Sequence, residues 1–157
     1  MLKLYKQINN EFHYWETWEN DKTTAIVHWG IVGQRGLDKK VKSGRFSSFR
    51  ETIQKEIDEK QKDDYSVFEE DKMRFLSVEY SIEDFGTDKD IEKRHRLEDY
   101  LNELLGWTGL GHVDGGSIGS GTMEVGCMVV DFDIAKKVVE NNLKDTEFSN
   151  YSKIKEE

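Results

Sequence analysis

Short alternating stretches of apolar and polar residues fill the first part of the chain. The stretch 12–18 is rich in aromatic residues, and the stretch 23–29 is rich in β-branched and apolar residues. Such stretches are typical of strands, and the Asn-Asp pair at 20–21 between them is typical of a hairpin turn. We expect a third strand over 40–46. The first part of the chain is therefore predicted to form an antiparallel sheet.

The pattern changes to a helical period at Ser48. Ser48 and Glu51 have the spacing of a capping box, in which each side chain accepts a hydrogen bond from a backbone amide at the start of a helix. The apolar residues that follow at spacing four are Phe49, Ile53 and Ile57. They predict one amphipathic helix, with its apolar stripe facing a core, that ends near Lys62.

A second arrangement begins after the charged run 69–72. Apolar and polar residues alternate over 76–82, which predicts a half-buried strand. A helix is expected to begin at Thr87 or Asp88. We expect it to end at Gly106, because glycine readily adopts the left-handed conformation that closes a helix.

The glycine-rich segment 109–121 leads into 123–130, the most strand-like run of the chain. We interpret these two segments as the middle hairpin of the second part. Asp131 or Asp133 is expected to cap a third helix, and a last weak strand is expected over 148–154. The resulting order β-α-β-β-α-β is the ferredoxin-like topology, in a domain whose pattern points to no particular family.

These patterns predict an α+β protein of two domains, 1–69 and 73–157. Alternate residues of the strand 123–130 are expected to lie beneath the two helices of the second domain. These are Met123, Val125, Cys127 and Val129. The residues that face the other way are Gly126, Met128 and Val130. They form a second apolar face, which we expect the first domain or a partner to cover.

Composition limits the compartment and the chemistry. Charged residues make up 35% of the chain and hydrophobic residues 36%, but aromatic residues reach 11%, which favours a folded chain with a lean core. Cys127 is the only cysteine, so no intramolecular disulfide can form. The first residues lack the apolar core of a signal peptide, and no apolar run has membrane-spanning length. We therefore expect a cytoplasmic protein without a membrane segment, cofactor or bound metal.

The net charge of −9 is unevenly distributed. Residues 1–70 carry a net charge of −1, and residues 71–157 carry −8. The acidic second part disfavours contact with phosphate backbones, because like charges repel. The basic residues of the first part gather in one segment that is opposed by Asp38 alone. They are Arg35, Lys39, Lys40, Lys42, Arg45 and Arg50.

The segment 28–36 carries the most informative pattern of the chain. Trp29 and Gly30 follow an apolar strand, and two more glycines come at spacings of three, at positions 33 and 36. Glycine is the residue that adopts positive φ or a close backbone approach at low cost. The segment therefore predicts a strand that runs into a tight turn.

Phe46 before the helix and Tyr65 after it complete a pattern over residues 2–68 that resembles the WGR domain. WGR domains help poly(ADP-ribose) polymerases to bind broken nucleic acid, so the resemblance implies a nucleic-acid-binding surface. It places that surface on Trp29, Gly30, Arg35, Lys39, Lys40, Lys42 and Arg45.

One position departs from the WGR signature, because Ile31 stands where the arginine is expected. Isoleucine makes none of the charge-assisted contacts that a guanidinium makes to phosphate. Arg35 can replace that arginine only if the turn places its side chain on the same surface. Two structural alternatives stay open: Trp29 is a core or half-buried indole, and the basic cluster is a solvated strand edge.

The glycine-rich segment is a second candidate site. Its candidate residues are His112, Asp114, Gly115, Gly116 and Ser120. His112 and Asp114 would share one face of an extended segment, where they are candidates for acid-base or metal chemistry. The segment fits neither a P-loop nor a dinucleotide fingerprint, because it lacks Gly-Lys-Ser/Thr and a strand follows it. A hairpin with turn glycines is the alternative interpretation.

We interpret the chain as a non-enzymatic binding protein. The leading hypothesis is WGR-type recognition of nucleic acid, or of a nucleic-acid-associated protein, through the basic segment. The alternative is a small acidic inhibitor or immunity-type protein that binds a basic toxin or nuclease through the acidic part, 71–157. A third hypothesis is an enzyme that uses the loop from His112 to Gly121.

Overall fold

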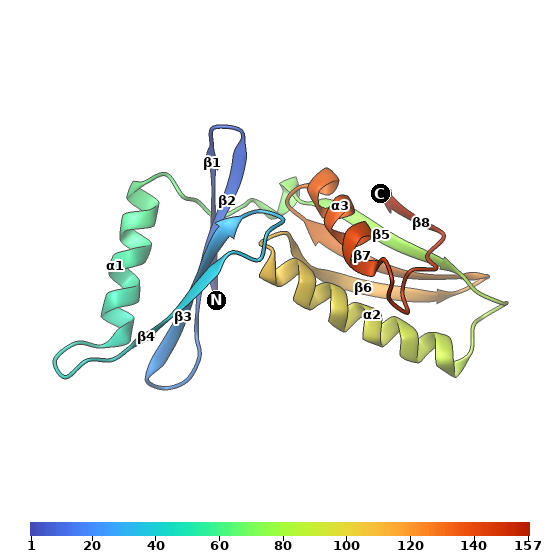
Figure 1. Cartoon of the computed structure of the whole chain (residues 1–157), viewed down its shortest axis with the longest axis horizontal. Coiled ribbons are helices and arrows are strands. Elements are labelled where there is room, and N and C mark those ends of the chain that lie inside the picture. The colour runs from blue at the N-terminus through green and yellow to red at the C-terminus, as the bar shows by residue number, and fades with distance from the viewer. The chain divides into compact units, whose positions relative to one another are not determined.

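The computed structural model describes residues 1–157, and the chain divides into two compact units, residues 1–69 and 70–157. The protein is α+β. Each unit contains a four-stranded antiparallel sheet, to which the first unit adds one helix and the second adds two. The predicted fold class, a sheet with one helix followed by a β-α-β-β-α-β arrangement, is confirmed (Figure 1).

The four strands of the first unit lie side by side in chain order. They are β1 (Leu2–Ile8), β2 (Glu11–Glu19), β3 (Thr24–Ile31) and β4 (Leu37–Lys42). The third strand predicted over 40–46 is misplaced, because pairing with β3 begins at Leu37, opposite Trp29. The strand β1 was not predicted at all. The outer edge of β4 pairs with no other strand of the sheet.

Helix α1 (Phe49–Lys62) lies across β3 and β4 on one face of this sheet (Figure 1). Its predicted capping box is confirmed. The Ser48 hydroxyl accepts a hydrogen bond from the amide of Arg50 at 3.2 Å, and the Glu51 carboxylate accepts one from the amide of Ser48 at 3.3 Å. These bonds satisfy amides that the first turn of a helix leaves without partners.

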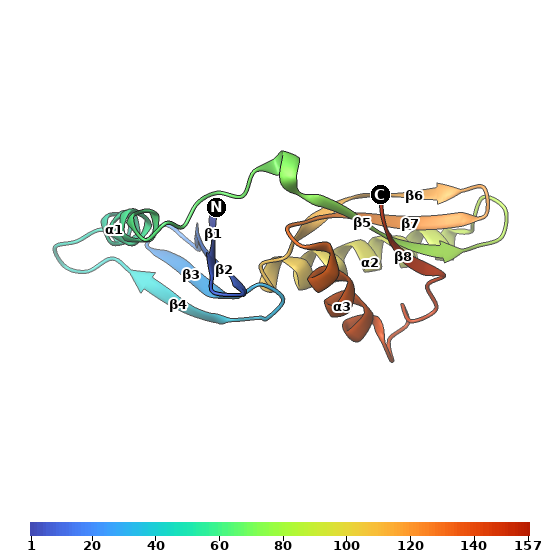
Figure 2. The same cartoon turned by 90° about the horizontal axis from the view of Figure 1, so that it is seen from above.

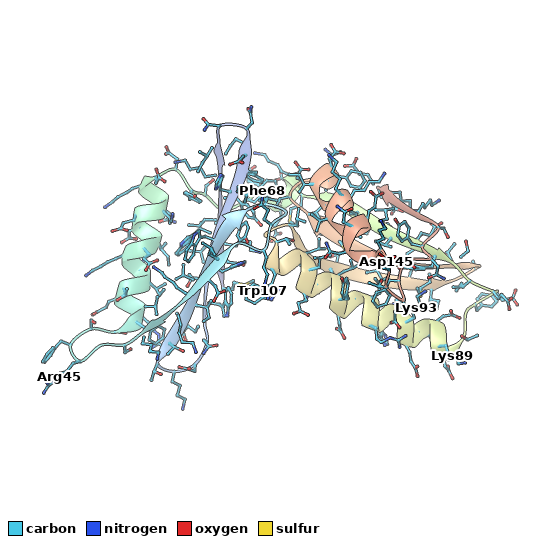
Figure 3. All side chains as sticks on the ribbon, viewed as in Figure 1. Arg45, Phe68, Lys89, Lys93, Trp107 and Asp145 are labelled. Carbon is cyan, nitrogen blue, oxygen red and sulfur yellow. The ribbon has the colours of Figure 1, made fainter.

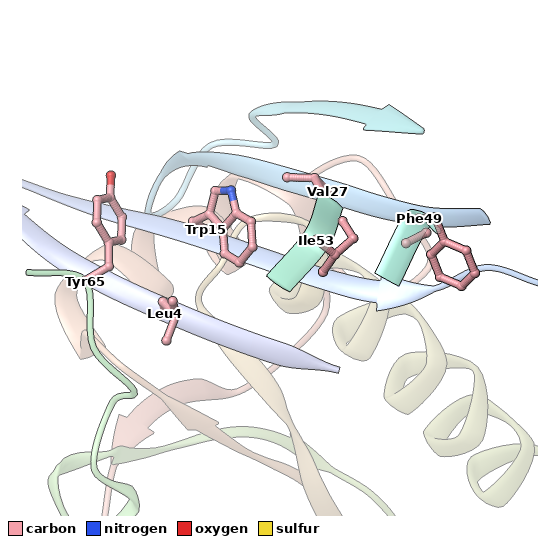
Figure 4. Close-up of a cluster of buried hydrophobic side chains, with 7 residues drawn as sticks. Leu4, Trp15, Val27, Phe49, Ile53 and Tyr65 are labelled. Atoms are coloured by element: carbon pink, nitrogen blue, oxygen red, sulfur yellow. The ribbon is translucent and has the colours of Figure 1, made fainter. Parts of the chain in front are cut away.

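The core of the first unit lies between α1 and the sheet (Figure 4). Leu4, Trp15 and Val27 come from three neighbouring strands and pack with Phe49 and Ile53 of the helix. Removal of these side chains from water is the main stabilising contribution to the unit.

The second unit begins with a single 3-10 turn, Glu70–Lys72. Its elements are β5 (Arg74–Ser81), α2 (Asp88–Trp107), β6 (Gly111–Gly119), β7 (Thr122–Val129), α3 (Phe132–Leu143) and β8 (Lys153–Glu156). The strands lie in the order β6-β7-β5-β8, and all neighbours are antiparallel. Both helices lie on the same face of this sheet (Figure 2). The glycine-rich segment thus forms the first strand of the middle hairpin, as predicted.

The predicted starts of both helices in this unit are confirmed. The side chains of Thr87 and Asp131 accept hydrogen bonds from amides in the first turns of α2 and α3, at 3.3 and 2.9 Å. The predicted end of α2 at Gly106 is wrong. The amide of Leu110 still bonds to a helical carbonyl across the end of α2, so the positive φ of +66° falls at Gly109 instead.

Alternate residues of β7 face the two helices and are fully buried. They are Met123, Val125, Cys127 and Val129. Burial, with a smaller contribution from the charge of Asp114, raises the pKa of the Cys127 thiol to about 12. The thiol is therefore protonated at neutral pH and packs as a small apolar group.

The opposite face of this sheet is less apolar than predicted. The ring of Phe75 on β5 covers Gly126, where a Cβ would overlap the ring. Lys155 of β8 approaches the carboxylates of Glu79 and Glu124 at 3.4 Å each. Charged side chains therefore interrupt the second apolar face that alternation predicts.

Candidate functional site

Three buried polar side chains on β2 and β3 support the segment that carries the WGR-like pattern. Tyr14, Glu16 and His28 lie on the sheet face opposite α1, because they alternate with residues that face the helix. Glu16 and His28 are cross-strand neighbours, and Glu16 Oε1 lies 2.7 Å from His28 Nδ1. Lys3 of β1 approaches the second oxygen of Glu16 at 3.1 Å. The carboxylate is therefore paired on both sides, although Glu16 is only 4% exposed.

The same network reaches the backbone of the turn after β3. His28 Nε2 lies 2.5 Å from the carbonyl oxygen of Arg35, and the Tyr14 hydroxyl lies 2.9 Å from the carbonyl oxygens of Gln34 and Arg35. Both partners of the His28 ring offer oxygen atoms that accept hydrogen bonds, and which ring nitrogen donates depends on the tautomer of His28. Burial, and then the charge of Glu16, raise the pKa of Tyr14, so its hydroxyl remains a donor.

The glycines of this segment fold the turn back against its own strand. Gly33 and Gly36 have φ values of +93° and +70°, which side chains on L residues rarely allow. A Cβ at Gly36 would overlap the carbonyl oxygen of Trp29 and would lie 2.5 Å from the Tyr14 hydroxyl. At Gly30, a Cβ would lie 2.8 Å from the Cα of Gly36. The predicted tight turn with close backbone approach is confirmed.

Trp29 lies on the other side of the sheet, facing α1. Its indole is half-buried and packs at the margin of the core, together with Val41 and Ile57. The structure therefore gives Trp29 a packing role and separates its side chain from the buried network of Tyr14 and His28.

Strand β4 divides the predicted basic residues between two faces. Lys39 faces α1, where its Nζ lies 2.8 Å from a carboxylate oxygen of Glu56. Lys40 and Lys42 alternate with it and therefore share the opposite face. The structure brings Lys40 and Lys42 together and does not bring Lys39 to them.

The arginines of the basic segment also differ in their surroundings. Arg35 is exposed, in the turn whose backbone the buried network holds. Arg50 makes two hydrogen bonds to the carboxylate of Glu19, at 2.8 and 3.1 Å, so its charge is matched. Arg45 lies in the loop that follows β4, so the alternation of side chains along the strand does not assign it to either face of the sheet.

Four exposed cations on β4, on the loop that follows it and on the β2–β3 turn have no carboxylate partner within 4.0 Å. We call them the basic rim: Lys22, Lys40, Lys42 and Arg45. The amide of Ser43 donates to the carbonyl of Thr23 at 3.1 Å, which brings the β2–β3 turn with Lys22 beside the end of β4. Sequence reasoning missed Lys22 because it precedes the basic segment by a whole strand. The only signal in the sequence is that Lys22 lies in the β2–β3 turn, which comes next to the end of the strand that pairs with β3.

The loop 43–48 presents one aromatic residue next to the basic rim. The amide of Gly44 donates to the carbonyl of Ser47 at 2.9 Å, and the amide of Phe49 donates to the Ser43 hydroxyl at 3.1 Å. Phe46 is 93% exposed, and the Arg45 guanidinium lies 5.6 Å from the centre of its ring. Figure 3 shows Arg45 projecting from this loop. The sequence pattern placed Phe46 at the end of a strand, which hid its exposure.

The candidate residues of the glycine-rich segment are spread along one hairpin. His112, Asp114, Gly115 and Gly116 are exposed on β6, and Ser120 lies in the turn before β7. Ser120 follows His112 by eight positions, roughly 26 Å along a strand. The pairing of β6 with β7 skips Asp114, so a bulge interrupts the alternation that would align it with His112. These residues therefore do not converge on one site.

No group of three or more His, Cys, Asp or Glu side chains is placed to hold a metal ion. None of the three helices combines the length and the apolar character that crossing a membrane requires. Comparison of the chain with protein-family models, curated proteins and solved structures gives no match. The function is therefore inferred from the geometry of the basic rim and its surroundings.

Proposed function

We propose that the protein is a non-enzymatic nucleic-acid-binding protein whose basic rim contacts the phosphate backbone. The observation that carries this proposal is the absence of carboxylate partners at Lys22, Lys40, Lys42 and Arg45. A cation that is already paired gains little from phosphate, because the new contact replaces an existing one. Unpaired cations gain the contact and release the counterions of the nucleic acid.

The charge distribution supports binding through the first unit. Residues 37–50 contain five basic residues and one acidic residue, whereas residues 71–157 carry a net charge of −8. A polyanion is therefore attracted to the basic rim and repelled by most of the second unit. The WGR resemblance agrees with this placement, although Ile31 removes the arginine of the signature.

The test is the salt dependence of binding by a double variant, Lys40→Gln with Lys42→Gln. Each lost phosphate contact lowers the slope of log affinity against log salt by about 0.7 for a single strand and about 0.9 for a duplex. We expect the double variant to lower the slope by about 1.4 to 1.8 and to weaken binding at low salt. Fluorescence anisotropy with labelled DNA measures both quantities.

The matched control is the double variant Lys137→Gln with Lys144→Gln. These exposed lysines of the second unit have no carboxylate partner within 4.0 Å, and replacing them gives the same change in net charge. We expect them to leave the slope unchanged. Absence of binding by the unaltered protein at low salt, or equal effects of the two double variants, would contradict the proposal. Selective capture of a basic protein without nucleic acid would favour the acidic-inhibitor alternative.

A further inference from the structure

The most exposed aromatic side chain of the protein lies in the loop that also carries Arg45 of the basic rim. Phe46 is 93% exposed, although burying a phenyl ring is favourable and such rings are usually inside. The loop that carries it is fixed by hydrogen bonds at Gly44 and Ser43, so the ring is held outward by a defined backbone. Exposure of this ring is therefore a property of the folded loop.

The charge around Phe46 distinguishes it from the other highly exposed phenyl ring. Arg45 lies 5.6 Å from the ring centre of Phe46, and Lys42 ends the preceding strand. Phe85 is 79% exposed, but it follows Glu83 and Asp84 in the chain. Exposure alone therefore does not select a ligand, whereas an exposed ring among unpaired cations suits a ligand with both phosphates and flat apolar surfaces.

We propose that the basic rim takes single-stranded nucleic acid, with Phe46 as the platform on which one unpaired base stacks. This inference rests on the proposed function. Bases in a duplex are stacked on one another and show only their edges in the grooves, so a phenyl ring cannot reach their faces. In a single strand the faces are available, and aromatic rings among basic residues are the usual way to bind them without sequence preference.

Arg45 extends the same surface. Its guanidinium lies over the ring of Phe46, which leaves the other face of the ring for a base. Lys40 and Lys42 on the preceding strand then meet phosphates of the same nucleic-acid strand. Sequence preference is expected to be weak, because every base has a face that can stack.

The experiment compares a short labelled DNA strand with the same strand in duplex form, by anisotropy at low salt. The variants are Phe46→Leu, Phe46→Trp and the control Phe85→Leu. We expect Phe46→Leu to weaken single-strand binding at least about fivefold and to leave the salt slope unchanged, because the loss is in stacking and not in charge. Phe46→Trp should bind at least as tightly as the unaltered protein, and Phe85→Leu should bind equally.

The outcomes separate this inference from the proposal on which it rests. If the unaltered protein binds neither form of DNA, both fail. If Lys40→Gln with Lys42→Gln weakens binding but Phe46→Leu does not, or if the duplex binds as tightly as the strand, only the stacking platform is overturned. Because Phe46 is exposed, its variants should keep the thermal midpoint of the unaltered protein, and that measurement accompanies the binding data.

Discussion

Tyr14 shows how one hydroxyl connects the interior of the first unit to its surface turn. The residue is 1% exposed, yet its oxygen lies 2.9 Å from two carbonyls of the turn and 3.2 Å from His28. Backbone carbonyls that lie partly buried against a sheet are usually satisfied by protein donors, and here the phenol is one of them. The turn that carries Arg35 is therefore held by residues that belong to the strands beneath it.

Replacing Tyr14 with phenylalanine tests this dependence. We expect Tyr14→Phe to lower the free energy of unfolding by about 1–3 kcal/mol, because the carbonyls of Gln34 and Arg35 lose the hydrogen bond from the phenol while the ring remains. Urea unfolding measures the loss through tryptophan fluorescence, since Trp15, Trp18 and Trp29 all belong to the first unit.

The control for this prediction is Tyr65→Phe in the same unit. Tyr65 is also buried, at 8% exposed, but its hydroxyl makes no hydrogen bond within the protein. We expect a change of about 0.5 kcal/mol or less. Equal losses for the two variants would show that the Tyr14 hydroxyl does not support the turn.

At the scale of elements, the β3–β4 connection depends on backbone conformation more than on side chains. The positive φ of Gly36 and its close approach to Trp29 allow β4 to return directly along β3. The connection sets the register of β4, and that register decides which lysines face away from α1.

A single methyl group at this position tests the connection. We expect Gly36→Ala to cost at least about 1–2 kcal/mol from the left-handed conformation alone, and more because the methyl group overlaps the backbone. Gly44→Ala is the control, because Gly44 has no positive φ and its nearest neighbour is the rotatable Ser47 hydroxyl. Circular dichroism during thermal unfolding ranks the two, and a Gly36→Ala midpoint as high as that of Gly44→Ala would contradict the prediction.

Local sequence signals predicted the elements whose determinants lie within a few residues. The capping box at Ser48, the cap at Thr87 and the alternation in β7 are of this kind, and each is confirmed. The limits of β4 and the end of α2 were predicted wrongly, because pairing with β3 and the Leu110 hydrogen bond fix them from outside the local segment.

The site was less predictable than the fold for the same reason. Sequence proximity grouped Lys39 with Lys40, but the pleat of a strand places them on opposite faces. Lys22 joins the basic rim only through the pairing of Thr23 with Ser43. The pairing of Glu16 with His28 joins residues twelve positions apart, and no sequence motif predicts it.

At the scale of the whole molecule, each unit has its own buried phenols. Tyr5 and Tyr14 lie in the first unit and Tyr80 lies in the second. Burial is the largest cause that raises the pKa of each of these hydroxyls above its ordinary value. The unfolded chain therefore releases these protons at lower pH than the folded protein does.

This difference predicts how stability depends on alkaline pH. The contribution is fully present below the ordinary tyrosine pKa of about 10 and is lost as the pH rises above it, because the unfolded state then binds fewer protons. Urea midpoints measured through this range should fall. Phenolate absorbance should show these tyrosines ionising only as the protein unfolds, and Tyr80→Phe should reduce the effect for the second unit. A midpoint that stays constant well above pH 10 would contradict the prediction.

The open edge of β4 has a further consequence for experiments on this protein. Its free amide and carbonyl groups offer a template on which another chain can add a strand, and lysines on such an edge keep other chains away by mutual repulsion. Neutral substitutions at Lys40 and Lys42 remove that repulsion together with the phosphate contacts that we propose. Light scattering should therefore accompany every titration of the neutralised protein, so that self-association is not mistaken for lost affinity.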